Sequence, residues 1–183
     1  MSNNQLLVCI PTYNRPAAIQ RQVRTILKQK NDRVKLVVYD NHSDVPVHEL
    51  FNQEELKSFT LFRNKVNVGA EANKGRCLEF SNEGWIWPLG DDDMLSDDAV
   101  EQMLALIDSH QDCCYINVGT KKTIETKNYQ EFLDYFKIRG AFGQAYFQSA
   151  CLFNMDKLAT SLYWYYDYLT SQIGQIMFVL KYL

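Results

Sequence analysis

Trp85-Ile86-Trp87-Pro88-Leu89-Gly90-Asp91-Asp92-Asp93 joins a short apolar run directly to three consecutive aspartates. Carboxylates packed this closely repel one another, so a protein that keeps them at a strand end usually binds a cation there or uses a carboxylate in catalysis. The alternative is a solvated turn before a helix, because Ser96-Asp97-Asp98 follows and acidic residues favour helix N-termini. Metal and phosphate chemistry is therefore the first hypothesis.

On both sides of this stretch, strand-like runs alternate with helical patterns. Helices are expected from Pro16, from Ala70 to Phe80, around Val100 and from Met155 onward, with a short one near 47–56. Apolar and branched residues predict strands at 6–10, 34–39, 59–62, 85–89, 113–118 and 146–153. This alternation predicts an α/β fold, a Rossmann-like three-layer α/β/α sandwich with a mainly parallel sheet.

Composition favours a single globular domain. The chain has 183 residues, of which 46% are hydrophobic and 22% charged. Its 19 basic and 22 acidic residues give a net charge of -3, and the scattered basic residues argue against nucleic-acid binding. Five cysteines without C-x-x-C spacing predict buried, reduced thiols. The first residues lack the basic and apolar regions of a secretion signal, which favours a cytoplasmic protein.

Polar residues follow three of the expected strands, at 11–15, 40–44 and 91–93. Open α/β sheets bind ligands at the carboxyl ends of their strands. A chain built for stability alone would have short turns at these positions. We therefore expect the three segments to form one binding site.

Four motifs, in this order, resemble glycosyltransferase family 2. That family has the GT-A fold, transfers a sugar from a nucleotide-sugar donor and usually inverts the anomeric centre. The resemblance covers about 6–110 and rests on Ile10-Pro11-Thr12-Tyr13-Asn14-Arg15, on Val37-Val38-Tyr39-Asp40-Asn41-His42-Ser43-Asp44, on Asn67-Val68-Gly69 with Ala72-Asn73, and on Pro88-Leu89-Gly90-Asp91-Asp92-Asp93. It implies one GT-A-like domain over 1–183, with a nucleotide-sugar half at 1–118 and an acceptor-side part at 119–183.

The resemblance implies a set of substrate-binding residues. In it, Asp40 accepts a hydrogen bond from the nucleotide base, and Lys74 approaches the phosphates. The predicted substrate-binding residues are Pro11, Thr12, Tyr13, Arg15, Asp40, Asn41, Asn73, Asp91 and Asp92. Two alternatives stay open, because Asp40 also suits a turn closed with Ser43 and an exposed lysine is often only solvated.

The aspartates divide their roles in the same resemblance. One of Asp91 and Asp92 contacts the ribose, and Asp93, helped by Asp91, binds the divalent cation that bridges the diphosphate. Hard oxygen ligands suit Mg²⁺ and Mn²⁺ equally, so the sequence does not choose between them. The ion would neutralise charge on the departing diphosphate.

Inversion also needs a general base that takes the proton of the acceptor hydroxyl. The downstream acids are Glu131, Asp134, Asp156 and Asp167. Asp167 is our candidate, because it lies in the aromatic run 162–168, where burial would raise its pKa and suit it to this role. A capping or interfacial acid is the alternative.

The last helical pattern carries a wide apolar face, formed by Leu169, Ile173, Ile176, Met177, Leu180 and Leu183. The abrupt end at Leu183 allows three interpretations, namely a truncated chain, a contact with a second copy, and a contact with the inner face of a membrane. Polar residues interrupt the segment too often for it to span a bilayer.

Two classes of function compete. The first is a metal-dependent glycosyltransferase that moves sugar from a nucleotide sugar, with UDP-sugar as the expected donor, to a glycan or lipid-linked acceptor in surface polysaccharide synthesis. The second is a nucleotide-sugar-binding domain of the same fold that lacks a general base. A nucleotidyltransferase is a further alternative, but residues 11–14 are not the Gly-rich loop that such enzymes carry.

Overall fold

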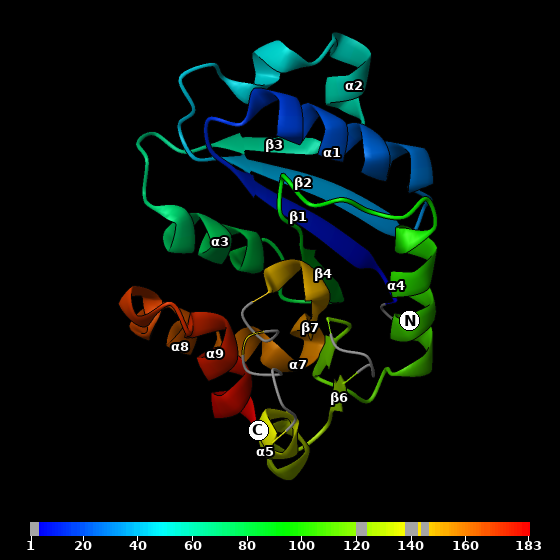
Figure 1. Ribbon diagram of the computed structural model, residues 1–183, viewed down its shortest axis with the longest axis vertical. Coiled ribbons are helices and arrows are strands. Elements are labelled where there is room, and N and C mark those ends of the chain that lie inside the picture. Colours follow the sequence, from blue (N-terminus) through cyan, green and yellow to red (C-terminus); the bar gives the residue numbers. More distant parts are fainter. Residues whose placement is uncertain (1–3, 120–123, 138–142, 144–146) are drawn as a thin grey trace.

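The computed structural model describes residues 4–119, 124–137, 143 and 147–183. Its strands form one sheet in the order β3-β2-β1-β4-β7-β5-β6 (Figure 1). The strands are β1 Leu6–Thr12, β2 Val34–Asp40, β3 Thr60–Arg63, β4 Trp85–Pro88, β5 Tyr115–Asn117, β6 Ile124–Thr126 and β7 Cys151–Asn154.

The sheet is mainly parallel, as the sequence predicts. Strands β1 to β4 run parallel, and β7 lies antiparallel between β4 and β5. Since β6 is antiparallel to β5, five of the seven described strands run in one direction. The expected strand at 146–153 is observed only at Cys151–Asn154, after a 3-10 turn at Gln148–Ala150, and residue 146 is outside the described part of the chain.

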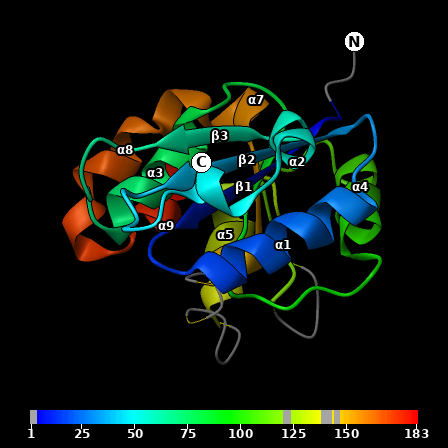
Figure 2. The same cartoon turned by 90° about the horizontal axis from the view of Figure 1, so that it is seen from above.

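Helices cover both faces of the sheet, which gives the predicted three layers (Figure 2). Side chains alternate along β1, so that Leu6, Val8 and Ile10 pack in one core with α1 and α4, and Leu7 and Cys9 pack in the other with α3, α5, α7, α8 and α9. The helices are α1 Pro16–Gln29, α2 Gln53–Lys57, α3 Ala70–Glu79, α4 Ala99–Ser109, α5 Tyr129–Lys137, α7 Met155–Leu158, α8 Tyr163–Asp167 and α9 Gly174–Tyr182.

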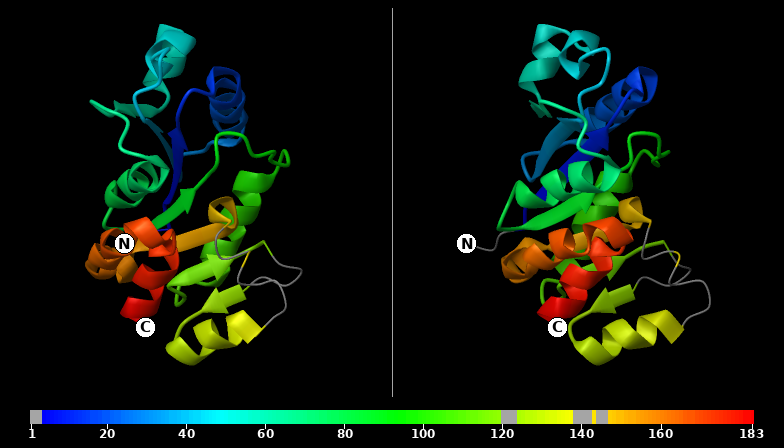
Figure 3. Two further views of the ribbon diagram at one scale, coloured as in Figure 1. Left: turned by 60° about the vertical axis from the view of Figure 1, so that its left-hand side comes forward. Right: turned by 90° about the vertical axis from the view of Figure 1, so that its left-hand side faces the viewer.

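The chain after Met155 differs from the expected continuous helix. It is broken into α7, α8 and α9, with 3-10 turns at Ala159–Ser161 and Leu169–Ser171 between them. Gln172 has a left-handed backbone with φ of 62°, which ends the second turn before α9 starts. The helices fold back on one another beside α3 (Figure 3). The segment is therefore helical as predicted, but it forms three short helices and not one continuous helix.

The apolar face of the last segment is partly covered within the chain. Ile176, Phe178 and Val179 of α9 are buried in the core, whereas Met177, Leu180 and Leu183 are half-buried. Contact with a second copy or with a membrane surface stays a prediction. Among the described helices, none combines the length and the apolarity that crossing a membrane requires.

Candidate nucleotide-binding site

One cleft of about 410 Å³ lies at the carboxyl ends of β1, β2 and β4. The register of the strands brings these three ends together, because Thr12 lies beside Asp40 and Cys9 lies beside Pro88. The loops after the three strands therefore share one edge of the sheet. The cleft contains every predicted substrate-binding residue except Asp40. It is lined by Pro11, Thr12, Tyr13, Arg15, Asn41, Ala70, Asn73, Lys74, Gly90, Asp91, Asp92 and Gln148.

Asp91 is a buried carboxylate held from both sides. The hydroxyl of Thr12 donates to its Oδ2 at 2.6 Å, and Nη1 of Arg15 donates to its Oδ1 at 3.0 Å. The same Arg15 nitrogen reaches the exposed Asp92 at 2.7 Å. The hydrogen bond to Asp91, together with the charges of both aspartates, raises the pKa of Arg15 above its usual value. The first motif therefore fixes the aspartate motif, and one guanidinium offsets the repulsion between two carboxylates.

Asp93 lies beside the cleft, and its carboxylate is hydrogen-bonded to neighbouring residues of the protein. Its Oδ2 accepts from the backbone N–H of Gly90 at 3.1 Å and from the hydroxyl of Ser149. A Cβ at position 90 would lie 2.5 Å from that same oxygen, so a larger residue there would displace the Asp93 carboxylate. All hydrogen bonds of Asp93 within the described residues use Oδ2, which leaves Oδ1 for another ligand.

The donor set fits a hard divalent cation bound together with a diphosphate. Within the described residues, no three His, Cys, Asp or Glu side chains lie close enough to hold an ion by themselves. Mg²⁺ commonly binds through one or two carboxylates and takes its other ligands from water and substrate phosphates. Asp93, through its Oδ1, and Asp91 would hold the ion in that manner.

Asp40 is buried, with 1% of its side chain exposed, and it does not line the cleft. Its Oδ1 accepts from the N–H of Ser43 at 2.8 Å, and its Oδ2 accepts from Arg63 and from the N–H of Val47 at 3.4 Å. Burial alone would raise the pKa of Asp40, but the hydrogen bonds from Ser43, Arg63 and Val47 outweigh burial and lower the pKa. The turn with Ser43 is present, and a bond to a nucleotide base stays a prediction.

An asparagine network holds the other wall of the cleft. The Nδ2 of Asn41 donates to Asn67 at 2.8 Å and to the carbonyl of Gly69 at 3.3 Å. Its Oδ1 accepts from Asn64 at 2.9 Å and from the N–H of Val68 at 3.0 Å. These bonds use the full capacity of the Asn41 amide, so this residue shapes the cleft.

Asn73 belongs to the same network, at the start of α3. Its Nδ2 donates to the carbonyl of Tyr39 at 3.0 Å, and its Oδ1 accepts from Asn64 at 2.8 Å. Since an amide nitrogen has two hydrogens, Asn73 keeps one donor for a ligand. Beside it, Lys74 pairs with Glu71 at 2.9 Å. The ring of Tyr13, which is 43% exposed, offers a stacking face at the cleft.

Asp167 is exposed, so the expectation that it is buried is wrong. Successive residues of a helix are 100° apart, so Asp167 lies about 200° from the buried Tyr165 in α8 and faces outward. Asp167 does not line the cleft, and neither do Glu131, Asp134 and Asp156. Asp134 pairs with Lys137, and Asp156 accepts from the N–H of Gly84 at 3.0 Å. A role for Asp167 as general base stays a prediction without support from burial.

Gln148 and Ser149 belong to the site, although the sequence does not indicate them. Gln148 lines the cleft, and Ser149 contacts Asp93 from 56 residues further along the chain. Both precede β7, whose position beside β4 brings them to the aspartates. A polar pair outside any motif carries no signal by itself, and only the antiparallel insertion of β7 places it.

Comparisons with known proteins find relatives in sequence and in fold. Abequosyltransferase RfbV of Salmonella typhimurium is 28% identical over 109 residues, which are 57% of this chain and 33% of that protein. S. aureus TarS (residues 1–349) has the same fold, with a TM-score of 0.68 and 17% identity over 97% of this chain and 55% of that one. PcManGT, a mannosyltransferase from Pyrobaculum calidifontis solved with GDP-Man and Mn²⁺, gives a TM-score of 0.62 and 16% identity over 85% of this chain and 46% of that one.

The region shared with RfbV amounts to about a third of that relative's length. The sequence profile described as Glycosyl transferase family 2 matches residues 7–160, which contain all the cleft-lining residues and the aspartates. With the four motifs at the carboxyl edge of a mainly parallel sheet, and with this match over most of its length, the chain belongs to glycosyl transferase family 2.

Proposed function

We propose that this chain carries the donor-binding part of a metal-dependent glycosyltransferase that transfers sugar, with inversion, from a nucleoside-diphosphate sugar to a hydroxyl group. The observation that carries the proposal is the single cleft in which the loops after β1, β2 and β4 meet, with Asp91 and Asp92 in its wall and Asp93 beside it. Family membership supports the same reaction class.

In this proposal, each side of the cleft binds a different part of the donor. Tyr13 stacks on the base, and the remaining donor of Asn73 hydrogen-bonds to the nucleoside. Arg15 and Lys74 face the phosphates, because they are the cationic residues among those that line the cleft. Asp92, whose side chain is exposed, is better placed than the buried Asp91 to reach the ribose.

Asp93 and Asp91 would hold Mg²⁺ or Mn²⁺ against the diphosphate. When bound, the ion supplies Lewis-acid stabilisation of the charge on the departing nucleoside diphosphate. Arg15 holds Asp91 in its orientation, and Ser149 and Gly90 hold one oxygen of Asp93 in place. These contacts are built before the substrate arrives, which lowers the cost of ordering the site during the reaction.

The expected donor is a UDP-sugar, and the expected acceptor is a glycan or a lipid-linked sugar of a surface polysaccharide. TarS, which shares the fold, has been solved with UDP and with UDP-GlcNAc, whereas PcManGT has been solved with GDP-Man. The relative named abequosyltransferase supports transfer of a sugar group. Which nucleotide this chain binds is therefore the first property to measure.

A nucleotide-sugar-binding domain without transferase activity is the second candidate. One observation favours it, because the acids that line the cleft are Asp91 and Asp92, and both pair with Arg15. None of the four downstream acids weighed as a base lines the cleft. Donor hydrolysis separates the two candidates, since a binding domain holds the nucleotide sugar without cleaving it.

Thermal denaturation of the chain with UDP, GDP, CMP and dTDP species, each with and without Mn²⁺, tests the proposal. A ligand at 100 times its Kd stabilises the fold by about 2.7 kcal/mol, which raises the Tm. Because the ion is proposed to hold the diphosphate against the aspartates, one nucleotide is expected to raise the Tm only when Mn²⁺ is present. Asp93→Ala is expected to abolish the part that depends on Mn²⁺. Asp97→Ala, which removes an exposed carboxylate outside the cleft, is the matched control and should behave as wild type. The proposal fails if no nucleotide gives a Mn²⁺-dependent shift.

A further inference from the structure

Ser149 is held in place through both its backbone carbonyl and its side-chain hydroxyl. Its carbonyl accepts from the indole N–H of Trp87 at 2.7 Å, and Trp87 is buried in β4. Its hydroxyl oxygen accepts from the backbone N–H of Gly90 at 2.8 Å. The residue before it, Gln148, lines the cleft, and Ala150 after it is buried. Ser149 therefore occupies one position between β4 and the aspartate turn.

The hydrogen of the Ser149 hydroxyl is directed at Asp93. A hydroxyl group has one hydrogen, and the N–H of Gly90 already occupies one of its lone pairs. The remaining neighbour is Oδ2 of Asp93, to which the hydroxyl donates. Gly90 donates to the same carboxylate oxygen at 3.1 Å, which closes a triangle of Gly90, Ser149 and Asp93.

This triangle determines how the carboxylate of Asp93 is oriented. Two donors hold Oδ2, whereas Oδ1 has no hydrogen bond to a described residue. Because two donors fix Oδ2, rotation of the carboxylate is restricted. Hydrogen bonds to a carboxylate ligand commonly set metal affinity in this way, and their loss typically weakens binding by about 10-fold to 100-fold.

We propose that Ser149 is a positioning residue, which orients Asp93 so that its free oxygen binds the divalent cation of the nucleotide-sugar complex. The inference rests on the proposed function, since it assumes that Asp93 binds the ion. It adds a residue outside the aspartate motif, from the segment before β7, to the cation site. In this role the hydroxyl of Ser149 acts through Asp93 and is not itself a ligand of the ion.

Mn²⁺ binding in the presence of saturating UDP, measured by titration calorimetry or by the electron paramagnetic resonance of free Mn²⁺, tests this role without requiring turnover. Ser149→Ala is expected to raise the Kd for Mn²⁺ by about tenfold or more. Ser149→Thr keeps the hydroxyl and is expected to stay near the wild-type value. Ser161→Ala is the matched control, because it removes a hydroxyl that donates to the carbonyl of Leu158 at 2.8 Å, away from the cleft.

The outcomes separate the two proposals. If the wild type binds no Mn²⁺ with UDP or with any other nucleotide, the proposed function fails and this inference with it. If the wild type binds Mn²⁺ and Ser149→Ala binds it equally well, only the role of Ser149 is overturned. If Ser149→Ala lowers the Tm without ion and Ser149→Thr does not restore the Kd for Mn²⁺, the residue is structural, and the inference also fails.

Discussion

The buried Asp40 pairs with Arg63, whose side chain is 30% exposed, and the loop after β2 depends on this pair. The Asp40 side chain is 1% exposed, and Arg63 reaches it from the neighbouring edge strand β3, while donating to the carbonyl of Ser43 at 2.8 Å. Burial of a charge without a partner costs several kcal/mol. The countercharge from β3 therefore holds the turn that supports Asn41 and one wall of the cleft.

This pair makes the folded chain sensitive to acid. Burial raises the pKa of Asp40, but the bonds from Ser43, Arg63 and Val47 lower it below the value of an exposed carboxyl. A group with a lowered pKa stabilises the fold fully above its unfolded pKa of about 3.9 and loses that contribution as the pH falls through its folded pKa. The stability difference between wild type and Asp40→Asn is expected to be constant above about pH 5 and to shrink below about pH 4. Urea unfolding at each pH measures it.

Arg63→Met supplies the control for that experiment. The substitution leaves the Asp40 carboxylate buried without its cation, so we expect a loss of about 3 kcal/mol at neutral pH. The double variant Asp40→Asn/Arg63→Met should lose less than the sum of the single losses, because the two residues are in contact. Additive losses would show that the pair does not couple and would contradict the prediction.

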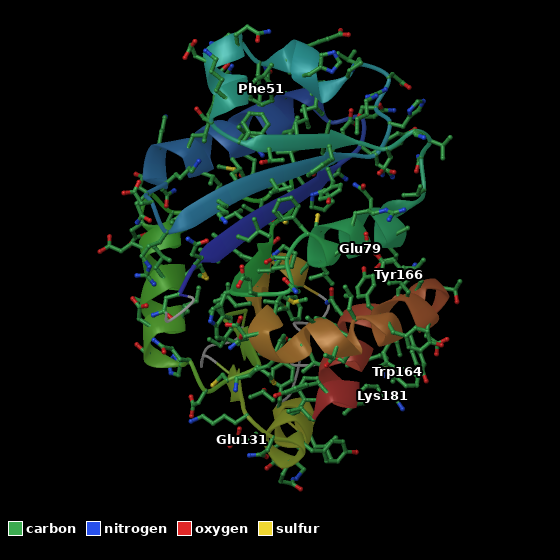
Figure 4. All side chains as sticks on the ribbon, turned by 180° about the vertical axis from the view of Figure 1, so that it is seen from behind. Phe51, Glu79, Glu131, Trp164, Tyr166 and Lys181 are labelled. Atoms are coloured by element: carbon green, nitrogen blue, oxygen red, sulfur yellow. The ribbon has the colours of Figure 1, made fainter. Side chains whose placement is uncertain are left out.

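Among the elements, the short helices of the C-terminal third pack through side-chain contacts and one close approach of backbones. Tyr166 of α8 donates to Glu79 of α3, and Lys181 of α9 lies 4.6 Å from the ring centre of Trp164 (Figure 4). Gly174, the first residue of α9, lies against the carbonyl of Tyr165. Since helices this short are not stable alone, these contacts hold them in place.

Gly174→Ala tests the contact between α8 and α9. A Cβ at this position would lie 2.6 Å from the backbone oxygen of Tyr165, which cannot turn away, so we expect a loss of about 1–3 kcal/mol in the free energy of unfolding. Gly75→Ala in α3 is the comparison, since its Cβ would meet the Tyr166 hydroxyl at 2.6 Å and the Tyr165 ring at 3.0 Å, which are side-chain atoms. Chemical denaturation of both variants decides, and an equal or larger loss for Gly75→Ala would contradict the argument.

For the whole molecule, the cores on the two faces of the sheet bury all five cysteine thiols. Cys9, Cys77, Cys113, Cys114 and Cys151 are all buried thiols outside any disulfide, as composition predicts. Burial raises the pKa of Cys114 to about 12 and that of Cys151 to about 11. At neutral pH, Cys114 and Cys151 are therefore protonated as well as buried, and the reactive form of cysteine is the thiolate.

Alkylation with iodoacetamide, read by mass spectrometry, checks this packing. In the folded chain at neutral pH, we expect the five thiols to stay unmodified over a time in which the chain in denaturant is labelled at all five. The denatured sample is its own control, because it shows that each thiol can react. Fast labelling of a single cysteine in the folded chain would place that residue at the surface and contradict the described core.

Secondary structure was predicted well where the sequence pattern is local. The strands at β1, β2, β3 and β4 and the helices at α1, α3 and α4 follow from apolar runs, Pro16 and helical periodicity, which act over a few residues. The sequence does not indicate that the helix expected from Met155 onward is divided into three short helices. Its helical periodicity is continuous, whereas the left-handed backbone at Gln172 and the packing of α8 on α9 interrupt the helix itself.

The sequence by itself determined the class of the fold and the family motifs, and it predicts the candidate site at the carboxyl edge of the sheet, because each motif follows a strand. Only the tertiary structure decided which polar atoms remain available in that site. Asp40 is neutralised by Arg63 from another strand, and Asp167 faces outward because Tyr165 takes the buried side of α8. Ser149 reaches Asp93 only because β7 inserts beside β4, and pairing between distant strands leaves no local signature in the sequence.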